Sequence, residues 1–255
     1  MEKIKLSKIS IYHYIRLIIR SVAFLVLLYY YLFYKIRDGI DIYTLFTTNQ
    51  VAFYIIFFMF IGEMILRFFP SPIESPGCQK QFEKNYVKTG KTEIYIQDNH
   101  GVVLVALIWI GLNCLFGACY MFGIFDDGIM ILLSSAYSVC DLICILFFCP
   151  FQSWILRNKC CCTCRIYNWD YAMMFTPLFF INKWYAWVLL VMAFILMVKW
   201  EILFYYHPER FSENTNGYLG CNNCTEKLCI HKTQLGSLWK KISEYTQKKI
   251  KDLMP

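Results

Sequence analysis

The stretch Gly101–Phe125, GVVLVALIWIGLNCLFGACYMFGIF, decides the fold class of this chain. It contains no charged side chain and no proline. At a rise of about 1.5 Å per residue, a helix of this length spans the roughly 30 Å hydrocarbon core of a bilayer. The stretch therefore predicts a transmembrane helix and places the chain among membrane proteins.

Other apolar runs of similar length lie on both sides of this stretch. A shorter run near 166–181 is interrupted by Pro177, so it is interpreted either as a further crossing or as a re-entrant piece. The sequence predicts an all-α, polytopic membrane helical bundle. Its predicted spans lie near residues 17–36, 51–69, 101–125, 129–148, 166–181 and 184–206.

The composition agrees with a membrane location. Hydrophobic residues make up 58% of the chain and charged residues only 17%, against about 25% in ordinary soluble domains. The net charge of +7 arises from cations that flank the apolar runs, as is typical of membrane proteins, so no nucleic acid is predicted as a partner. The predicted partner is the lipid bilayer, with other membrane subunits left open.

The distribution of Lys and Arg favours six crossings over five. With six crossings, twenty of the 25 cations fall on one side, and the other side receives three, Lys35, Arg37 and Lys183. Five crossings would move the cationic tail across and nearly remove this bias. The positive-inside rule therefore predicts six spans, with both termini cytosolic, in an inner or plasma membrane.

The predicted organisation has two parts. Residues 1–206 form the transmembrane bundle, and residues 207–255 form a cytosolic segment that contains cysteines and ends in a basic amphipathic helix. Apolar residues recur at helical spacing in this tail, with lysines among them, which is typical of a helix on an anionic membrane surface or against a partner subunit.

Two cysteine-rich segments, RNKCCCTC at 157–164 and CNNCTEKLCIHK at 221–232, fall on the predicted cytosolic face. Each contains a C-x-x-C pair, and two such pairs supply the four thiolates of a tetrahedral zinc site. An iron–sulfur cluster or thiol redox chemistry, and lipidation of the cysteines, remain alternatives. The predicted zinc ligands are Cys161, Cys164, Cys221 and Cys224, with Cys78, Cys160, Cys162, Cys229 and His231 as reserve ligands.

Glu63, Asp141 and Lys199 lie inside predicted spans, each six to eight residues from the cytosolic end of its helix. An unpaired charge at that depth costs roughly 2.5–3.5 kcal/mol, so a bridge from Lys199 to one of the acids is expected. Such a pair either lines a path for protons, ions or solutes, or fixes the register of the helices.

Three classes of function remain open at this stage. The cysteine segments favour a membrane metal or redox protein, and the intramembrane charges favour a small-solute or ion transporter. A structural subunit of a larger membrane complex would explain both. No Walker A, GxGxxG or HExxH motif is present, so the sequence assigns neither an enzymatic reaction nor a substrate.

Overall fold

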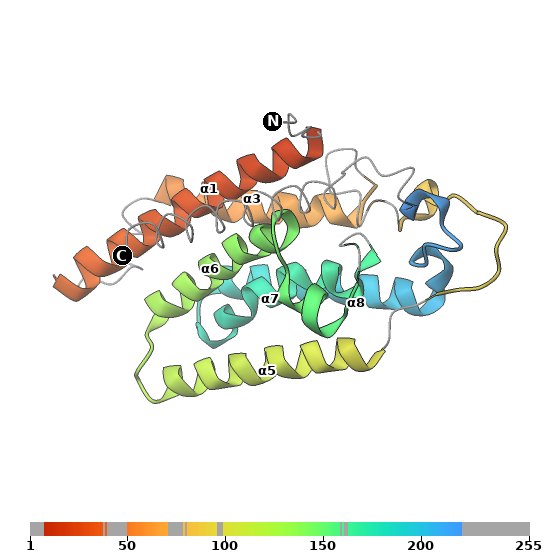
Figure 1. The fold of residues 1–255 in the computed structure, drawn as a ribbon. Coiled ribbons are helices and arrows are strands. Elements are labelled where there is room, and N and C mark those ends of the chain that lie inside the picture. The colour runs from red at the N-terminus through yellow and green to blue at the C-terminus, as the bar shows by residue number, and fades with distance from the viewer. Residues whose placement is uncertain are drawn as a thin grey trace, which may run out of the picture.

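In the computed structural model, the described residues are 8–37, 39, 50–70, 79, 81–95, 99–158, 160 and 163–220. They form a bundle of helices, and this part of the chain contains no strand, only an isolated bridge between Lys88 and Asn216. The α-helices are α1 (Lys8–Tyr30), α3 (Gln50–Phe68), α5 (Asn99–Met121), α6 (Asp127–Leu146), α7 (Asp170–Phe175) and α8 (Trp184–Tyr206) (Figure 1).

Four of the helices are long and apolar enough to cross a membrane. They cover Lys8–Phe33, Asn99–Met121, Asp127–Leu146 and Trp184–Tyr206. Many large apolar side chains on them point outward, including Ile18 and Leu107, which agrees with contact to lipid. The prediction of an α-helical, multi-pass membrane protein is confirmed at this level.

The first helix begins nine residues earlier than the predicted span of 17–36. The α-helix starts at Lys8 and passes at Tyr31 into a π-helical turn that ends at Ile36. The early turns hold polar residues, but these share one helical face, which is buried in the bundle. The hydropathy pattern did not predict these early turns, because hydropathy identifies segments that can face lipid and this polar face contacts protein. The buried residues are Ser10, His13, Arg16 and Arg20.

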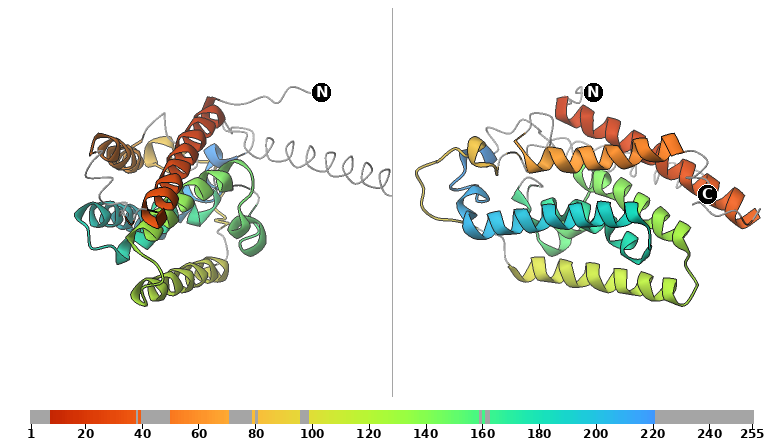
Figure 2. Two further views of the ribbon diagram at one scale, coloured as in Figure 1. Left: turned by 90° about the vertical axis from the view of Figure 1, so that its left-hand side faces the viewer. Right: turned by 180° about the vertical axis from the view of Figure 1, so that it is seen from behind.

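The helices pack in pairs. α1 lies on α6, and α3 lies on α8, while α5 forms an edge beneath them (Figures 1 and 2). At one end of the bundle lie the α5–α6 turn and the turn at 181–183, and we call this the hairpin end. At the opposite end, residues 81–95 and 207–220 fold together, and we call these two segments the loop cap.

The loop cap is held by backbone and side-chain hydrogen bonds. The Gly217 amide donates to the Val87 carbonyl at 2.7 Å, and the Thr89 amide donates to the Thr215 carbonyl at 3.2 Å. Asn216 is fully buried, and its Nδ2 donates to the Arg210 carbonyl at 2.8 Å. These contacts place the connection after α3 and the segment after α8 at the same end of the bundle.

The segment 166–181 forms the centre of the core. It consists of a 3₁₀ helix (Arg165–Trp169), α7 and a second 3₁₀ helix (Thr176–Phe180). Most of its apolar side chains, from Tyr171 to Ile181, are buried. Protein therefore surrounds the irregular backbone at Pro177, which is the condition under which such backbone is tolerated at membrane depth.

Two hydroxyl groups form hydrogen bonds to backbone carbonyls of this segment. The Ser134 Oγ of α6 donates to the Met174 carbonyl at 3.0 Å, and Thr176 Oγ1 donates to the Ala172 carbonyl at 2.6 Å. Hydroxyl side chains commonly form such contacts between helices in a membrane, and the bond to the broken segment explains why α6 carries a serine at position 134.

The same segment runs alongside α5 for most of its length. At the loop-cap end, Arg165 Nη1 donates to Asn99 Oδ1 at 2.8 Å. At the hairpin end, the Phe180 ring lies against Gly117 and 6.4 Å from the Tyr120 ring, centroid to centroid. Asn99 and Tyr120 are separated by about 30 Å along an α-helix, so the segment extends from one end of the bundle to the other.

Candidate functional site: a buried charge network between cavities

Glu63 of α3 is the centre of a buried ion-pair network. Its Oε2 accepts hydrogen bonds from Arg16 Nη2 at 2.7 Å and from Arg20 Nη2 at 2.6 Å, both from α1. The Tyr171 hydroxyl of α7 donates to the same oxygen at 2.9 Å. One carboxylate thus joins α1, α3 and α7, and all four side chains are buried.

The network continues to α6. Arg20 Nη1 lies 3.4 Å from Asp141 Oδ2 and donates to the Ser138 carbonyl at 3.0 Å. The Arg20 guanidinium also stacks over the Phe60 ring at 5.2 Å. A single arginine therefore bridges an acid of α3 and an acid of α6.

A second pair lies beside the first, between α3 and α7. Arg67 Nη1 lies 2.6 Å and 2.7 Å from the two carboxylate oxygens of Asp170. The guanidinium of Arg67 faces the rings of Tyr171 and Tyr167 at 4.7 Å and 5.6 Å. Among the described residues, the network has three arginines and three acids, so their formal charges cancel.

Two pairs with helical spacing create this arrangement. Arg16 and Arg20 are four residues apart in α1, and Glu63 and Arg67 are four residues apart in α3, so each pair lies on one helical face. Removing one partner of a buried pair commonly costs about 3–5 kcal/mol, although the intact pair adds little net stability. The network therefore fixes which faces of α1, α3, α6 and α7 meet.

The sequence indicated two acids of this network but not their partners. Glu63 and Asp141 both belong to it, whereas Lys199 does not bridge to either acid, contrary to the expected pairing. Lys199 Nζ instead donates to the Phe68 carbonyl at 2.5 Å and lies over the rings of Phe68 and Phe82. A cation at the last carbonyls of α3 stabilises that helix end. The four-residue spacing of Arg16 and Arg20 indicates that the two side chains share one helical face, but it does not indicate which acid that face meets.

His13 adds an unusual feature next to the network. Its side chain is 1% exposed, and neither ring nitrogen has a hydrogen-bond partner among the described residues. Buried polar atoms without partners are rare and costly, and they commonly mark the place of a water molecule or a ligand. The imidazole therefore contributes a free donor and a free acceptor beside the Arg16 side of the network.

A further ion pair fixes the loop-cap end. Arg165 Nη2 lies 2.5 Å from Glu201 Oε2, and the Trp169 indole nitrogen donates to Glu201 Oε1 at 2.7 Å. The Arg165 guanidinium also lies 4.2 Å from the centroid of the Phe204 ring. These contacts join the start of the 166–181 segment to the end of α8.

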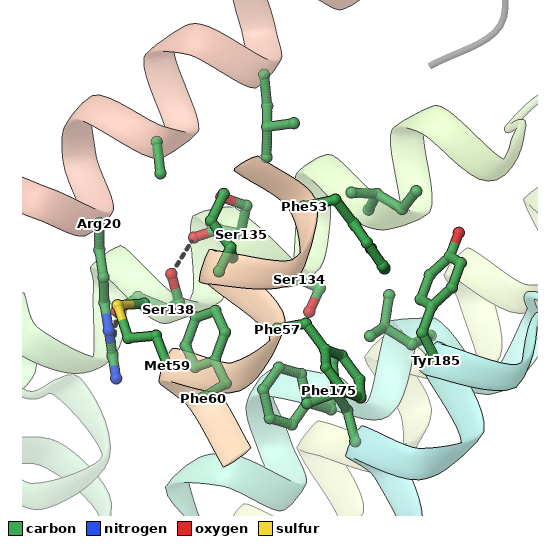
Figure 3. Close-up of a pocket in the computed structure, with 16 residues that line it drawn as sticks. Arg20, Phe53, Phe57, Met59, Phe60, Ser134, Ser135, Ser138, Phe175 and Tyr185 are labelled. Carbon is green, nitrogen blue, oxygen red and sulfur yellow. Dashed lines mark hydrogen bonds between the residues drawn. The ribbon is translucent and has the colours of Figure 1, made fainter. Parts of the chain in front are cut away.

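A cavity of about 100 Å³ lies on the hairpin side of the network, between α1, α3, α6 and α8. Arg20 and Ser138 form its boundary with the network, and its other walls are mainly aromatic and aliphatic (Figure 3). We call it the central cavity. Its labelled lining residues are Arg20, Phe53, Phe57, Met59, Phe60, Ser134, Ser135, Ser138, Phe175 and Tyr185.

A larger, polar cavity of about 520 Å³ lies at the hairpin end, and we call it the vestibule. Ile131 and Tyr185 line both the vestibule and the central cavity, so the two cavities adjoin. The vestibule walls carry Lys35 and Lys183 together with Asp126 and Asp127. The vestibule and the central cavity thus lie one after the other between the hairpin end and the charge network, with Ile131 and Tyr185 between them.

The predicted zinc ligands lie mostly outside the described residues. This applies to Cys161, Cys221 and Cys224, and to the reserve ligands Cys78, Cys162, Cys229 and His231. Cys164 is buried beside Val102 and Val105, and Cys160 is partly exposed. Within the described ranges, no group of three or more His, Cys, Asp or Glu side chains could hold a metal ion. The zinc site, the alternative iron–sulfur cluster and the tail helix remain predictions.

The fold and the site together define a multi-pass, helical membrane protein with a neutral, buried charge network next to two adjoining cavities. Comparisons of the chain with protein-family models, with curated proteins and with solved structures find no match. The function is therefore argued from the geometry of the site.

Proposed function

We propose that six segments cross the membrane and that both termini are cytosolic. The extent of residues 165–180 along α5, about 30 Å, supports a crossing by this segment, which adds to α1, α3, α5, α6 and α8. The cation bias supports placing the loop cap in the cytosol. The hairpin end, with Lys183, then faces outward.

Labelling of single introduced cysteines by a membrane-impermeant reagent tests this topology. Lys183→Cys should react from outside, and Lys240→Cys should react only from the cytosolic side. Reaction of residue 240 from outside would support five crossings and would also separate the two cysteine-rich segments across the bilayer.

We infer that the protein is a small-solute transporter and that the charge network is its cytosolic gate. The observation that carries this proposal is the adjoining pair of cavities, which begins at the proposed outer face and ends at Arg20. Beyond Arg20, buried ion pairs join α1, α3, α6 and α7 and separate the central cavity from the loop cap. This arrangement corresponds to an outward-facing state with a closed inner gate.

The gate has a defined opening step. The bonds from Arg16 and Arg20 to Glu63 are the links between α1 and α3 in the network, and α1 otherwise packs mainly on α6. Moving α1 away from α3 would break these two bonds and open the central cavity toward the cytosol. Because the network is neutral, its groups can exchange partners within it without leaving a net charge in the bundle.

The cavity walls define the class of solute. The vestibule has two lysines and two aspartates, which suit a solute with both an ammonium and a carboxylate group. The central cavity is small and mainly apolar, which suits a short apolar side chain. The class proposed is therefore a small zwitterion with an apolar group, for which neutral amino acids are the natural probes.

Uptake of radiolabelled neutral amino acids into proteoliposomes tests the proposal. We expect saturable uptake above that of empty liposomes, and loss of that uptake in Ile131→Trp, which fills the junction of the two cavities. Ile143→Trp is the matched control because Ile143 is 40% exposed on the same helix and lines neither cavity. Absence of saturable uptake, or uptake unchanged in Ile131→Trp, would refute the transporter proposal.

A cytosolic zinc site formed by Cys161, Cys164, Cys221 and Cys224 is a second proposal. It is favoured by the packing of Phe204 on Phe211, which brings the start of the 166–181 segment and the chain leading to Cys221 to the same end. Stoichiometric zinc in the purified protein, lost in Cys221→Ser but kept in Cys114→Ser, is the expected result. Protein isolated without chelators that holds no zinc would refute it, and iron in its place would favour the iron–sulfur alternative.

A further inference from the structure

A third cavity, of about 130 Å³, lies on the other side of α6 from the central cavity and is rich in sulfur. We call it the thiol cavity. Four cysteines and two methionines line it, although they come from three separate parts of the chain. These residues are Cys140, Cys144, Cys149, Cys164, Met173 and Met174.

Two of these thiols are direct neighbours. Cys144, in the last turn of α6, and Cys149, just beyond that helix, are hydrogen-bonding partners through their side chains. The backbone amide of Gln152 donates a hydrogen bond to Cys149 Sγ at 3.5 Å, which fixes the position of the Cys149 sulfur. Both cysteines are in the thiol form, not in a disulfide.

The carboxylates of the same cavity are already engaged. Asp141 is paired with Arg20, and Asp170 is paired with Arg67, so the donors left to a soft cation are the sulfur atoms, beside neutral groups such as the Tyr137 hydroxyl. Thiolate and thioether ligands select Cu(I) over harder cations. Cu(I) is stable with two or three soft donors, whereas the four-ligand group that structural zinc requires is absent from the described part of the chain.

We propose that the thiol cavity binds one Cu(I) ion between the sulfurs of Cys144 and Cys149, with a methionine thioether from the facing wall as the third donor. Binding displaces one thiol proton to solvent, so that a monovalent cation meets one thiolate and one remaining thiol. The complex is uncharged and adds no net charge to a buried site, where an uncompensated charge would be costly. The proposal does not depend on the transport function or on the cytosolic zinc site.

The test is an anaerobic Cu(I) titration of the full chain in detergent against a chromophoric Cu(I) chelator. Because other cysteines also bind copper, the measured quantity is the difference between variants. The double variant Cys144→Ser with Cys149→Ser should lose one equivalent of Cu(I). The hydroxyl introduced at position 149 still accepts the hydrogen bond from the backbone amide of Gln152. Cys114→Ser, on the exposed face of α5, is the matched control and should lose none.

Equal stoichiometry in the double variant and the native chain would overturn the proposal. A disulfide between Cys144 and Cys149 in protein purified without oxidant would overturn it as well, because the pair would then be a redox couple. If the double variant does not fold, Cys149→Met provides the second measurement, since it keeps a soft donor and should retain the equivalent that Cys149→Ser loses. Loss of the same equivalent in both single variants would contradict the site.

Discussion

The two ends of the bundle use the same ion-pair chemistry at very different burial. Near the loop cap, the Arg16, Arg20 and Arg67 side chains are 1–6% exposed, and each lies within 2.7 Å of a carboxylate oxygen. At the hairpin end, Lys35 lies 3.6 Å from Asp126, and the two side chains are 30% and 35% exposed. One end is closed by buried, multiply bonded charges, and the other is an open polar vestibule.

This difference shows where charge determines structure and where it leaves access. A buried guanidinium or carboxylate must be paired, so the network at the loop-cap end constrains four helices at once. An exposed pair is weak and can exchange its partner for a solute. The asymmetry is the physical basis for proposing a closed inner gate and an open outer mouth, and the following changes test it in order of expected effect.

The largest effect is expected for Glu63→Gln. It removes the one carboxylate that binds both Arg16 and Arg20, so a buried positive charge loses its compensation, at a cost of about 5 kcal/mol. Thermal unfolding in detergent should show a large decrease of the midpoint. A midpoint close to that of the native chain would mean that water reaches the network and that the network does not fix the packing of the helices.

Breaking the second pair should cost somewhat less. Asp170→Asn leaves the Arg67 guanidinium without its carboxylate, with an expected loss of about 3 kcal/mol. The double variant Arg67→Met with Asp170→Asn should be more stable than Asp170→Asn alone, because no buried charge is then uncompensated. Additive losses in this double-mutant cycle would show that the two side chains are not coupled.

A packing change at the hairpin end should have an intermediate effect. A Cβ atom at Gly117 would overlap the Phe180 ring, so Gly117→Ala should displace that ring from its place against α5, at a cost of about 1–3 kcal/mol. Gly111→Ala is the matched control, since nothing lies within 4 Å of that position and alanine favours the helix. Equal stability of the two variants would contradict the contact between this segment and α5.

The smallest effect is expected for Lys35→Met in the vestibule. Its pair with Asp126 is exposed, and exposed pairs contribute about 0–1 kcal/mol, so the unfolding midpoint should change little. Uptake of a zwitterionic solute should nevertheless fall, because a cation of the vestibule is lost. A destabilisation as large as that of Glu63→Gln would remove the distinction between the two ends.

Much of the architecture could be predicted from the sequence because helices that face lipid have high hydropathy over their whole length. The bounds predicted for 184–206 agree with α8, and those for 101–125 and 129–148 agree with α5 and α6 to within a few residues. The prediction failed where a helix turns polar residues toward protein, as α1 does with His13 and Arg16 before the predicted span. Hydropathy sums over all faces of a helix and therefore cannot separate a buried polar face from a solvated one.

The cations that pair with Glu63 and Asp141 could not be predicted from the sequence, for a different reason. Glu63 and Asp141 could be recognised as costly intramembrane acids, but the predicted spans offered more than one cation as a partner, among them Arg20 in 17–36 and Lys199 in 184–206. Only packing decides between them, because Arg16 and Arg20 reach Glu63 through the pairing of α1 with α6. The loop cap could not be predicted from the sequence either, because its buried Asn216 lies in a stretch without periodic apolar residues.

The central claim, that the cavities open outward and that the charge network closes them inward, is tested most directly by two-sided labelling at Ser135→Cys. This conservative change places a thiol in the wall of the central cavity. Right-side-out and inside-out vesicles are treated with a small, charged methanethiosulfonate, and modification of residue 135 is read by mass spectrometry, with Lys183→Cys and Lys240→Cys as markers of the two sides. A closed inner gate predicts modification from outside and none from the cytosolic side until Glu63→Gln is added. Modification from the cytosolic side in the presence of Glu63 would contradict it.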